Sequence, residues 1–192
     1  MEKVFQQRGS RRQQRGFSLI ELLIVVALIL IITALAVPNF LKSRMAANEA
    51  TTASAMKTIG TANVVYFSLY QVGYAGALAH LGPPGGACAS ISSGCAGLID
   101  SVISGVNPAT ATPTKNGYRF TYYAPNPTPT QTSTNRTWSI VTSPVTPGTS
   151  GLGSFCFDFT NVLWKDSSGA TTTAAATGCQ PTWAGGGNIA PN

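Results

Sequence analysis

The stretch RGFSLIELLIVVALILIITALAVP, residues 15–38, decides the fold of this chain of 192 residues. Positions 17–37 form an apolar run that contains a single charged side chain, Glu21. A helix rises 1.5 Å per residue, so a run of this length spans roughly 30 Å, the thickness of the hydrocarbon core of a bilayer. We therefore expect a membrane-spanning helix that carries one carboxylate near its start.

Most of the positive charge of the chain lies in front of this apolar run. Five basic residues and one acidic residue in the first sixteen positions contribute +4 of the net charge of +6. By the positive-inside rule, this arrangement predicts a cytoplasmic N-terminus and an exported C-terminal part. The later candidates for a basic patch are Lys115, Arg119, Arg136 and Lys165. Their scatter is more typical of a solvated face, so a nucleic-acid partner is compatible with the sequence but unsupported.

Three other kinds of segment compete for the apolar run. A cleaved secretory signal has a shorter apolar stretch, although Ala34-Leu35-Ala36 has the small-residue pattern of a cleavage site. A twin-arginine signal is suggested by Arg11-Arg12, but polar residues follow that pair. An uncleaved anchor leaves Glu21 unexplained, because a lone carboxylate costs about 2.5–3.5 kcal/mol at the bilayer centre.

Cleavage between Gly16 and Phe17 would give Glu21 a partner. The new terminal amine at Phe17 would lie four residues before Glu21, so each helix would carry a positive end and a negative group. In a staggered bundle of parallel helices, the carboxylate of one subunit can then pair with the amine of its neighbour. Glu21 would then direct how neighbouring subunits assemble.

The run Gly16-Phe17-Ser18-Leu19-Ile20-Glu21-Leu22-Leu23 resembles the N-terminal signature of type IV pilins and pseudopilins. The resemblance implies that a prepilin peptidase cuts after Gly16 and N-methylates Phe17. It also implies that Glu21 guides subunit docking and that Pro38 is the helix-distorting proline of the family. The expected partners are copies of the chain itself in a helical homopolymer, the peptidase, an inner-membrane assembly platform, and membrane lipid before assembly.

The remainder of the chain predicts an α+β fold of the pilin-like kind, with a long N-terminal helix packed on a small antiparallel sheet. We expect a leader at 1–16, a membrane and filament-core helix at 17–37, its amphipathic continuation at 38–72 and a globular head at 73–192. Pro38 removes a backbone donor and should bend or loosen the helix. One face of the continuation holds Leu41, Met45, Met56, Ile59, Tyr66 and Tyr70. Strands are expected at 118–123, 136–142, 155–159 and 162–164, and a short helix or turn at 97–105.

Four cysteines, Cys88, Cys95, Cys156 and Cys179, follow the export segment. An even number in an exported part predicts disulfides, with three possible connectivities. The simplest joins sequence neighbours, Cys88 with Cys95 and Cys156 with Cys179. A zinc site is disfavoured because the sequence has no paired CxxC and one histidine, His80. The resemblance implies that the second disulfide brackets a surface region of the head.

Catalytic residues are not evident in the sequence. His80 stands beside a Gly/Pro loop and is expected to be exposed, while Asp100, Asp158 and Asp166 are scattered. We predict no enzyme activity, no cofactor and no metal site, although a calcium site of loop oxygens stays open as an alternative.

The expected function is that of a structural pilin. It would be held in the inner membrane as a single-pass precursor and then exported into a cell-surface filament for adhesion, motility or DNA uptake. The alternatives are a pseudopilin of a type II secretion system, a minor tip pilin, and an uncleaved single-pass receptor or adhesin that keeps its leader. Bound calcium would favour the pseudopilin.

Overall fold

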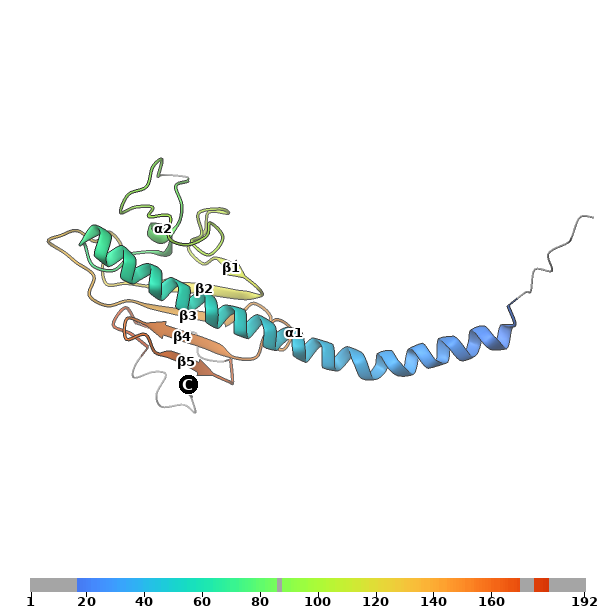
Figure 1. The fold of residues 1–192 in the computed structure, drawn as a ribbon. Helices are drawn as coiled ribbons and strands as arrows, with labels where there is room; N and C mark the ends of the chain where they lie inside the picture. The colour runs from blue at the N-terminus through green and yellow to red at the C-terminus, as the bar shows by residue number, and fades with distance from the viewer. Residues whose placement is uncertain (1–16, 86–87, 170–174, 180–192) are drawn as a thin grey trace, which may run out of the picture. The chain divides into compact units, whose positions relative to one another are not determined.

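The computed structural model describes residues 17–85, 88–169 and 175–179. Its elements are a long helix α1, Leu19–Tyr70, a single-turn helix α2, Leu78–Leu81, and five strands (Figure 1). The chain divides into two compact units, one up to Phe40 and one from Leu41 onward. The division falls inside α1.

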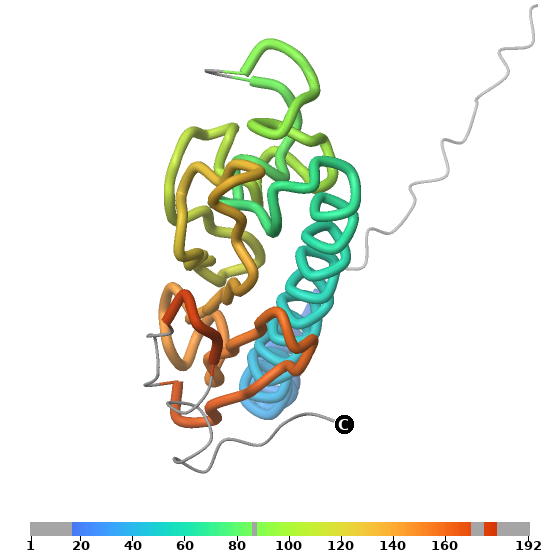
Figure 2. Tube along the Cα trace, turned by 90° about the vertical axis from the view of Figure 1, so that its left-hand side faces the viewer, coloured from blue at the N-terminus to red at the C-terminus, as the bar shows by residue number. Residues whose placement is uncertain are grey.

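The second unit contains a five-stranded antiparallel sheet in which every strand pairs with its neighbour in sequence. The strands are β1 Thr114–Lys115, β2 Tyr118–Tyr123, β3 Ser139–Pro144, β4 Ser154–Asp158 and β5 Leu163–Asp166. The second half of α1 lies along one face of this sheet in both views of the backbone (Figures 1 and 2). The expected α+β fold, a long helix on a small antiparallel sheet, is therefore confirmed.

The core forms between α1 and the sheet because side chains alternate across the strands. Met56, Ile59 and Tyr66 of α1 are at most 1% exposed and belong to the same cluster as the apolar face of the sheet. The sheet contributes Tyr118, Phe120, Trp138, Ile140, Phe155, Phe157 and Leu163. Gly60 permits a close approach of the helix, since a Cβ there would lie 2.4 Å from Cε1 of Phe157.

The helical face predicted from the sequence is buried in its middle but exposed at its start. Leu41 is 45% exposed. The residues of α1 that are buried begin at Thr52, so Leu41 precedes the part of the helix that the sheet covers.

Residues 101–105 form turns, one of the two forms expected for the segment 97–105, and Ile99 and Ile103 of this segment are buried in the core. Two local details differ from the sequence expectation, because helix α2 and the short strand β1 were not expected. The β1–β2 hairpin forms because Asn116 and Gly117 have φ of 52° and 77°, as a two-residue turn with an Asn-Gly sequence requires.

Two disulfides join cysteines that are neighbours in sequence, Cys88 to Cys95 and Cys156 to Cys179. The second ties residues 175–179 to β4 on the face of the sheet turned away from α1, where Val141 also packs. The backbone N–H of Cys179 donates to Oδ2 of Asp158 at 2.8 Å. This segment is therefore held both covalently and by a hydrogen bond to a carboxylate.

One carboxylate, that of Glu49, fixes the first turns of the covered helix to the sheet. Its Oε1 accepts hydrogen bonds from the backbone N–H groups of Leu152 and Gly153, at 2.9 and 3.0 Å. Its Oε2 lies 2.7 Å from Nζ of Lys165 on β5. Burial alone would raise the pKa of Glu49, but the bonds from Lys165 and from the two backbone N–H groups outweigh it and lower the pKa below 4.5.

We predict that Glu49→Gln destabilises the fold by about 1–2 kcal/mol at pH 7. The substitution removes the negative charge that accepts from three donors, and these donors then lose their charged acceptor. Since the folded-state pKa of Glu49 is lowered, its contribution is present above the unfolded-state pKa and is lost as the pH falls through the folded value. The wild-type chain should therefore lose more stability than Glu49→Gln between neutral pH and pH values below 4.5. Urea unfolding of the full chain in detergent measures both quantities.

Asp100→Asn is the matched control. It removes one charge from an ion pair in which the Asp100 side chain is 44% exposed, against 16% for Glu49. The loss should be below about 1 kcal/mol, because exposed pairs contribute little. Equal losses in the two variants would contradict the role given to Glu49.

Candidate assembly site

The start of α1 carries the charge predicted to direct assembly. The carbonyl of Ser18 accepts the first helical hydrogen bonds, from the N–H groups of Glu21 and Leu22, at 3.1 and 3.2 Å. Glu21 is exposed in the first turn, where the positive end of the helix dipole favours a carboxylate. Phe17 is 77% exposed immediately before the helix. Gly16, the predicted cleavage position, lies outside the described residues.

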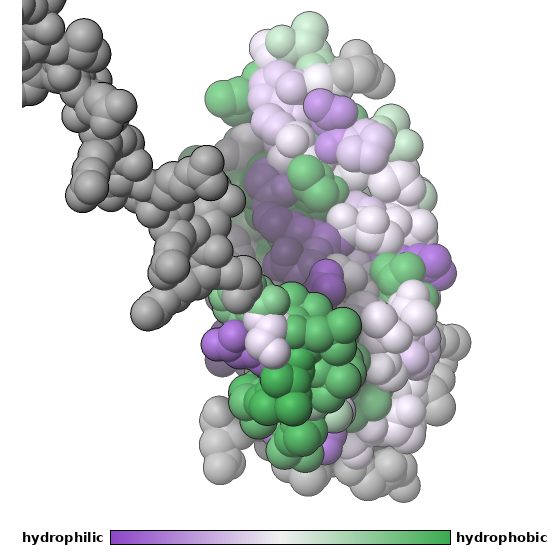
Figure 3. All heavy atoms as spheres, turned by 90° about the vertical axis from the view of Figure 1, so that its right-hand side faces the viewer, coloured by the Kyte–Doolittle hydropathy of each residue, from purple (hydrophilic) through white to green (hydrophobic). Residues whose placement is uncertain are grey.

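The first half of α1 presents apolar side chains on every side. The large apolar residues from Leu19 to Val37 are 47–82% exposed. In Figure 3 these side chains gather into one green surface. In the described part of the chain α1 alone is long and apolar enough to cross a membrane, and none of its most apolar window is buried. A helix that is apolar all round needs lipid or other apolar helices around it.

Pro38 lies within α1, as the sequence predicts, and the helix continues on both sides of it. Proline has no N–H, so the carbonyl of Ala34 loses its normal helical donor. The next carbonyl, that of Leu35, accepts a hydrogen bond from the side chain of Asn39 at 3.3 Å. An extra donor is thus placed beside the position where the helical ladder is interrupted.

The arrangement at the start of α1 can bind but does not resemble a catalytic centre. An exposed apolar cylinder gains free energy when it leaves water, at about 25 cal/mol per Å² of apolar surface. A carboxylate within that cylinder is costly unless a cation comes to it, and the attraction is strong where water is excluded. The geometry therefore favours association with helices that bring a positive group to the level of Glu21.

The acidic residues that the sequence left unassigned each serve a loop, and the structure does not bring them together. Asp100 accepts hydrogen bonds from the N–H groups of Val102 and Ile103 and pairs with Lys115 at 2.9 Å. Asp158 and Asp166 accept from residues in the turns that follow β4 and β5. No group of three metal-ligating side chains occurs within residues 17–85, 88–169 and 175–179.

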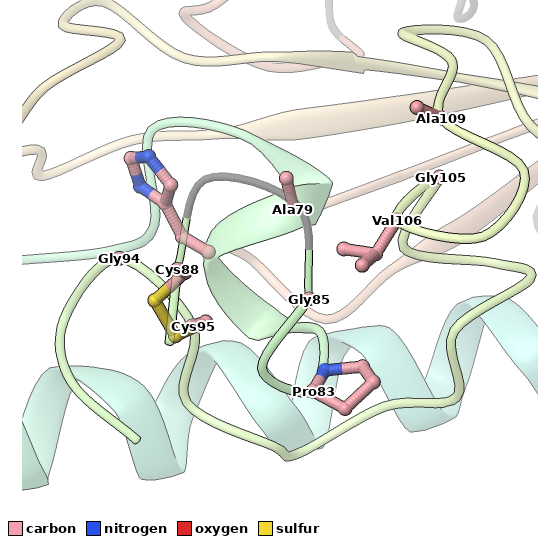
Figure 4. A pocket seen from close by; sticks show the side chains of 10 residues that line it. Ala79, Pro83, Gly85, Cys88, Gly94, Cys95, Gly105, Val106 and Ala109 are labelled. Carbon is pink, nitrogen blue, oxygen red and sulfur yellow. A yellow bond between two sulfur atoms is a disulfide. The ribbon is translucent and has the colours of Figure 1, made fainter. Parts of the chain in front are cut away.

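His80 is half-buried, so the expectation that it is exposed is wrong. Burial lowers the pKa of its imidazole, and its Nδ1 accepts a hydrogen bond from the N–H of Gly76 at 3.3 Å. It lines a mostly apolar hollow together with the Cys88–Cys95 disulfide. Figure 4 shows Pro83, Val106 and the disulfide around this hollow. The neutral histidine thus acts as a packing residue of the loop.

Sequence reasoning missed Glu49. A usable signal existed, since Glu49 precedes Met56 by seven residues, two helical turns, and so belongs to the buried face. A charged residue at a buried position predicts a specific partner.

The comparisons with known proteins concern the N-terminal region. Residues 11–37 match the family model of the prokaryotic N-terminal methylation motif. Over 56 residues the chain is 43% identical to the type IV major pilin protein PilA of Myxococcus xanthus (strain DK1622). The match covers 29% of this chain and 26% of that pilin, so the chain spans about a quarter of the length of this relative. No solved structure matches the chain. The chain therefore carries the type IV prepilin signature, and the resemblance noted at Gly16, Phe17 and Glu21 is confirmed at the level of that motif.

Proposed function

We propose that this chain is the structural subunit of a type IV pilus filament. It is made as a precursor, cut by a prepilin peptidase between Gly16 and Phe17, and N-methylated at Phe17. Residues 17–37 hold it in the inner membrane, and an assembly platform then moves it into a helical homopolymer at the cell surface. In this proposal the chain supplies surfaces rather than catalysis.

The observation that carries the proposal is the coincidence of the methylation motif with a bare apolar helix. The motif covers residues 11–37, and the large apolar side chains of α1 in that range are exposed. A lone helix of this kind is stable in lipid and can later exchange lipid for the helices of other subunits. The exchange leaves each apolar side chain in an apolar environment, so polymerisation needs no reaction at the subunit itself.

The placement of Glu21 supports the proposal further. Its carboxylate is exposed in the first turn of the helix, where the terminal amine of a neighbouring helix could approach it. In a water-free filament core a single orientation and stagger would satisfy both charges. The ion pair would select the register of the subunits, whereas the apolar surface would hold the helices together without selecting a register.

Processing of the leader determines which residue is first in the mature chain. Protein in filaments sheared from cells should begin at N-methylated Phe17, as measured by intact mass and N-terminal sequencing. Gly16→Val should keep the leader, remain in the membrane fraction and give no filaments, because a branched side chain at the cleavage position obstructs the peptidase. A wild-type chain that still begins at Met1 and is confined to membranes would instead indicate an anchored receptor.

Docking through Glu21 predicts that its charge is needed for filaments and not for membrane insertion. Glu21→Ala should insert into the membrane normally and reduce the filament yield by about tenfold or more, since breaking a buried ion pair costs about 3 kcal/mol or more. Glu21→Gln should behave like Glu21→Ala, because the charge matters more than the size. Shear fractions and membrane fractions quantified on the same blot measure yield and insertion together. Abundant filaments from either variant would remove Glu21 from the proposed mechanism.

A further inference from the structure

A small polar hollow lies beside the part of α1 that follows the apolar run. It has a volume of about 310 Å³ and is lined by Arg44, Asn48, Asn116, Gly117, Thr149 and Ser150. These residues come from three places in the second unit: α1, the β1–β2 turn and the loop between β3 and β4. No carboxylate lines the hollow.

The walls of the hollow are fixed by hydrogen bonds. The side chain of Asn48 donates to the carbonyl of Ser150 at 2.8 Å, which joins α1 to the β3–β4 loop. Ser150 is tied to Thr146 at the start of that loop through both its N–H and its hydroxyl, at 2.9 and 3.0 Å. Gly117 approaches closely, since a Cβ there would lie 2.7 Å from Cβ of Ser150.

Three polar side chains at this hollow, those of Arg44, Asn116 and Thr149, are exposed and can offer hydrogen-bond donors to a molecule from solution. Among the described residues, the ion pairs join Lys115 to Asp100 and Lys165 to Glu49, and neither includes Arg44. A guanidinium, an amide and a hydroxyl are all donors, and together they suit the several acceptor oxygens of one phosphate group. Arg44 and Asn48 are four residues apart, so they share one side of the helix.

The acids of the chain itself are poor partners for Arg44. Of the six acidic residues, Glu2 lies in the expected leader and Glu21 in the apolar run. Glu49 and Asp100 are paired with lysines, while Asp158 and Asp166 are buried. A second copy of the chain therefore has no uncommitted carboxylate among the described residues of its head. An anion from outside the protein is the better match.

We infer that this hollow is a phosphate-binding site, and that the phosphate is supplied by the head group of an anionic lipid. Arg44 follows the end of the apolar run at Val37 by seven residues in sequence, so a chain anchored in the membrane by that run keeps Arg44 near the lipid head groups. A basic residue close to a membrane surface attracts anionic lipid head groups. The choice of lipid as the source rests on the proposed membrane stage; the phosphate chemistry does not.

Native mass spectrometry of the full chain in detergent tests the site. With equal amounts of phosphatidylglycerol and phosphatidylcholine of the same acyl chains, the wild-type chain should retain phosphatidylglycerol about fivefold better. Arg44→Gln and Thr149→Ala should each lose this preference at least in part, and Arg44→Lys should keep only part of it, because lysine lacks the planar fork. Lys57→Gln, on the same helix but outside the hollow, should retain the full preference.

Two results would overturn the inference. One is the absence of any preference for phosphatidylglycerol in the wild-type chain. The other is an equal loss in Arg44→Gln and in Lys42→Gln with no loss in Thr149→Ala, which indicates diffuse attraction to a basic segment. Unfolding midpoints of all variants check that the head is intact, and Thr149→Ala and Arg44→Lys keep the test decisive if Arg44→Gln does not fold.

Inorganic phosphate distinguishes the two sources of the anion. If millimolar phosphate displaces phosphatidylglycerol and shifts the backbone amide signals of Gly117 and Thr149, the site accepts free phosphate and the lipid assignment is wrong. If it does neither while the lipid preference stands, the lipid assignment holds. These measurements do not depend on cleavage of the leader or on filaments, so failure of the proposed function would leave their outcome readable.

Discussion

The structure of the head depends on one face of α1 that runs from Glu49 to Tyr66. Residues on this face recur at alternating intervals of three and four, which keeps them on one side of a helix. The apolar members, Met56, Ile59 and Tyr66, cover the apolar side of the sheet. Without that cover the sheet would expose a large aromatic face to water, and without the sheet the helix would have no reason to be buried on one side.

Polar residues on the same face determine the alignment of helix and sheet. Glu49 receives two backbone N–H groups before β4 and the ammonium group of β5. Farther along, the side chain of Asn63 accepts from the N–H of Ala75 at 3.2 Å and lies 3.1 Å from the hydroxyl of Tyr122. Burial raises the pKa of that hydroxyl well above its usual range, so it stays a donor. Apolar packing alone tolerates sliding, whereas these directional contacts at two levels allow one alignment.

The sequence was informative where periodicity is strong and local. The α+β class, the helix face around Met56 and the alternation in 118–123 follow from residue spacing, and the structure agrees with each. The partners of Glu49 are at least 103 positions away in sequence, and residue spacing gives no register for such contacts. Helix α2 and β1 have four and two residues, too few for a periodic pattern. The Asn116-Gly117 dipeptide is typical of a two-residue hairpin turn, and the prediction from strand alternation did not take it into account. At the candidate assembly site, the resemblance to the pilin signature identified Phe17, Glu21 and Pro38, and the roles proposed for them depend on neighbours that a single chain does not contain.

The charged residues of the chain differ in whether the chain itself supplies their partners. From Phe17 onward the chain has seven basic and five acidic residues. Four of the five acids lie in the second unit, from Leu41 onward, and are satisfied there, by lysines or by the backbone of loops. The fifth, Glu21, has no basic residue within twenty positions after it, since Lys42 is the first. Glu21 in the apolar run and Arg44 beside the polar hollow are 23 positions apart in sequence, and neither belongs to an ion pair among the described residues. In the two proposals made above, both charges are assigned to partners outside the chain.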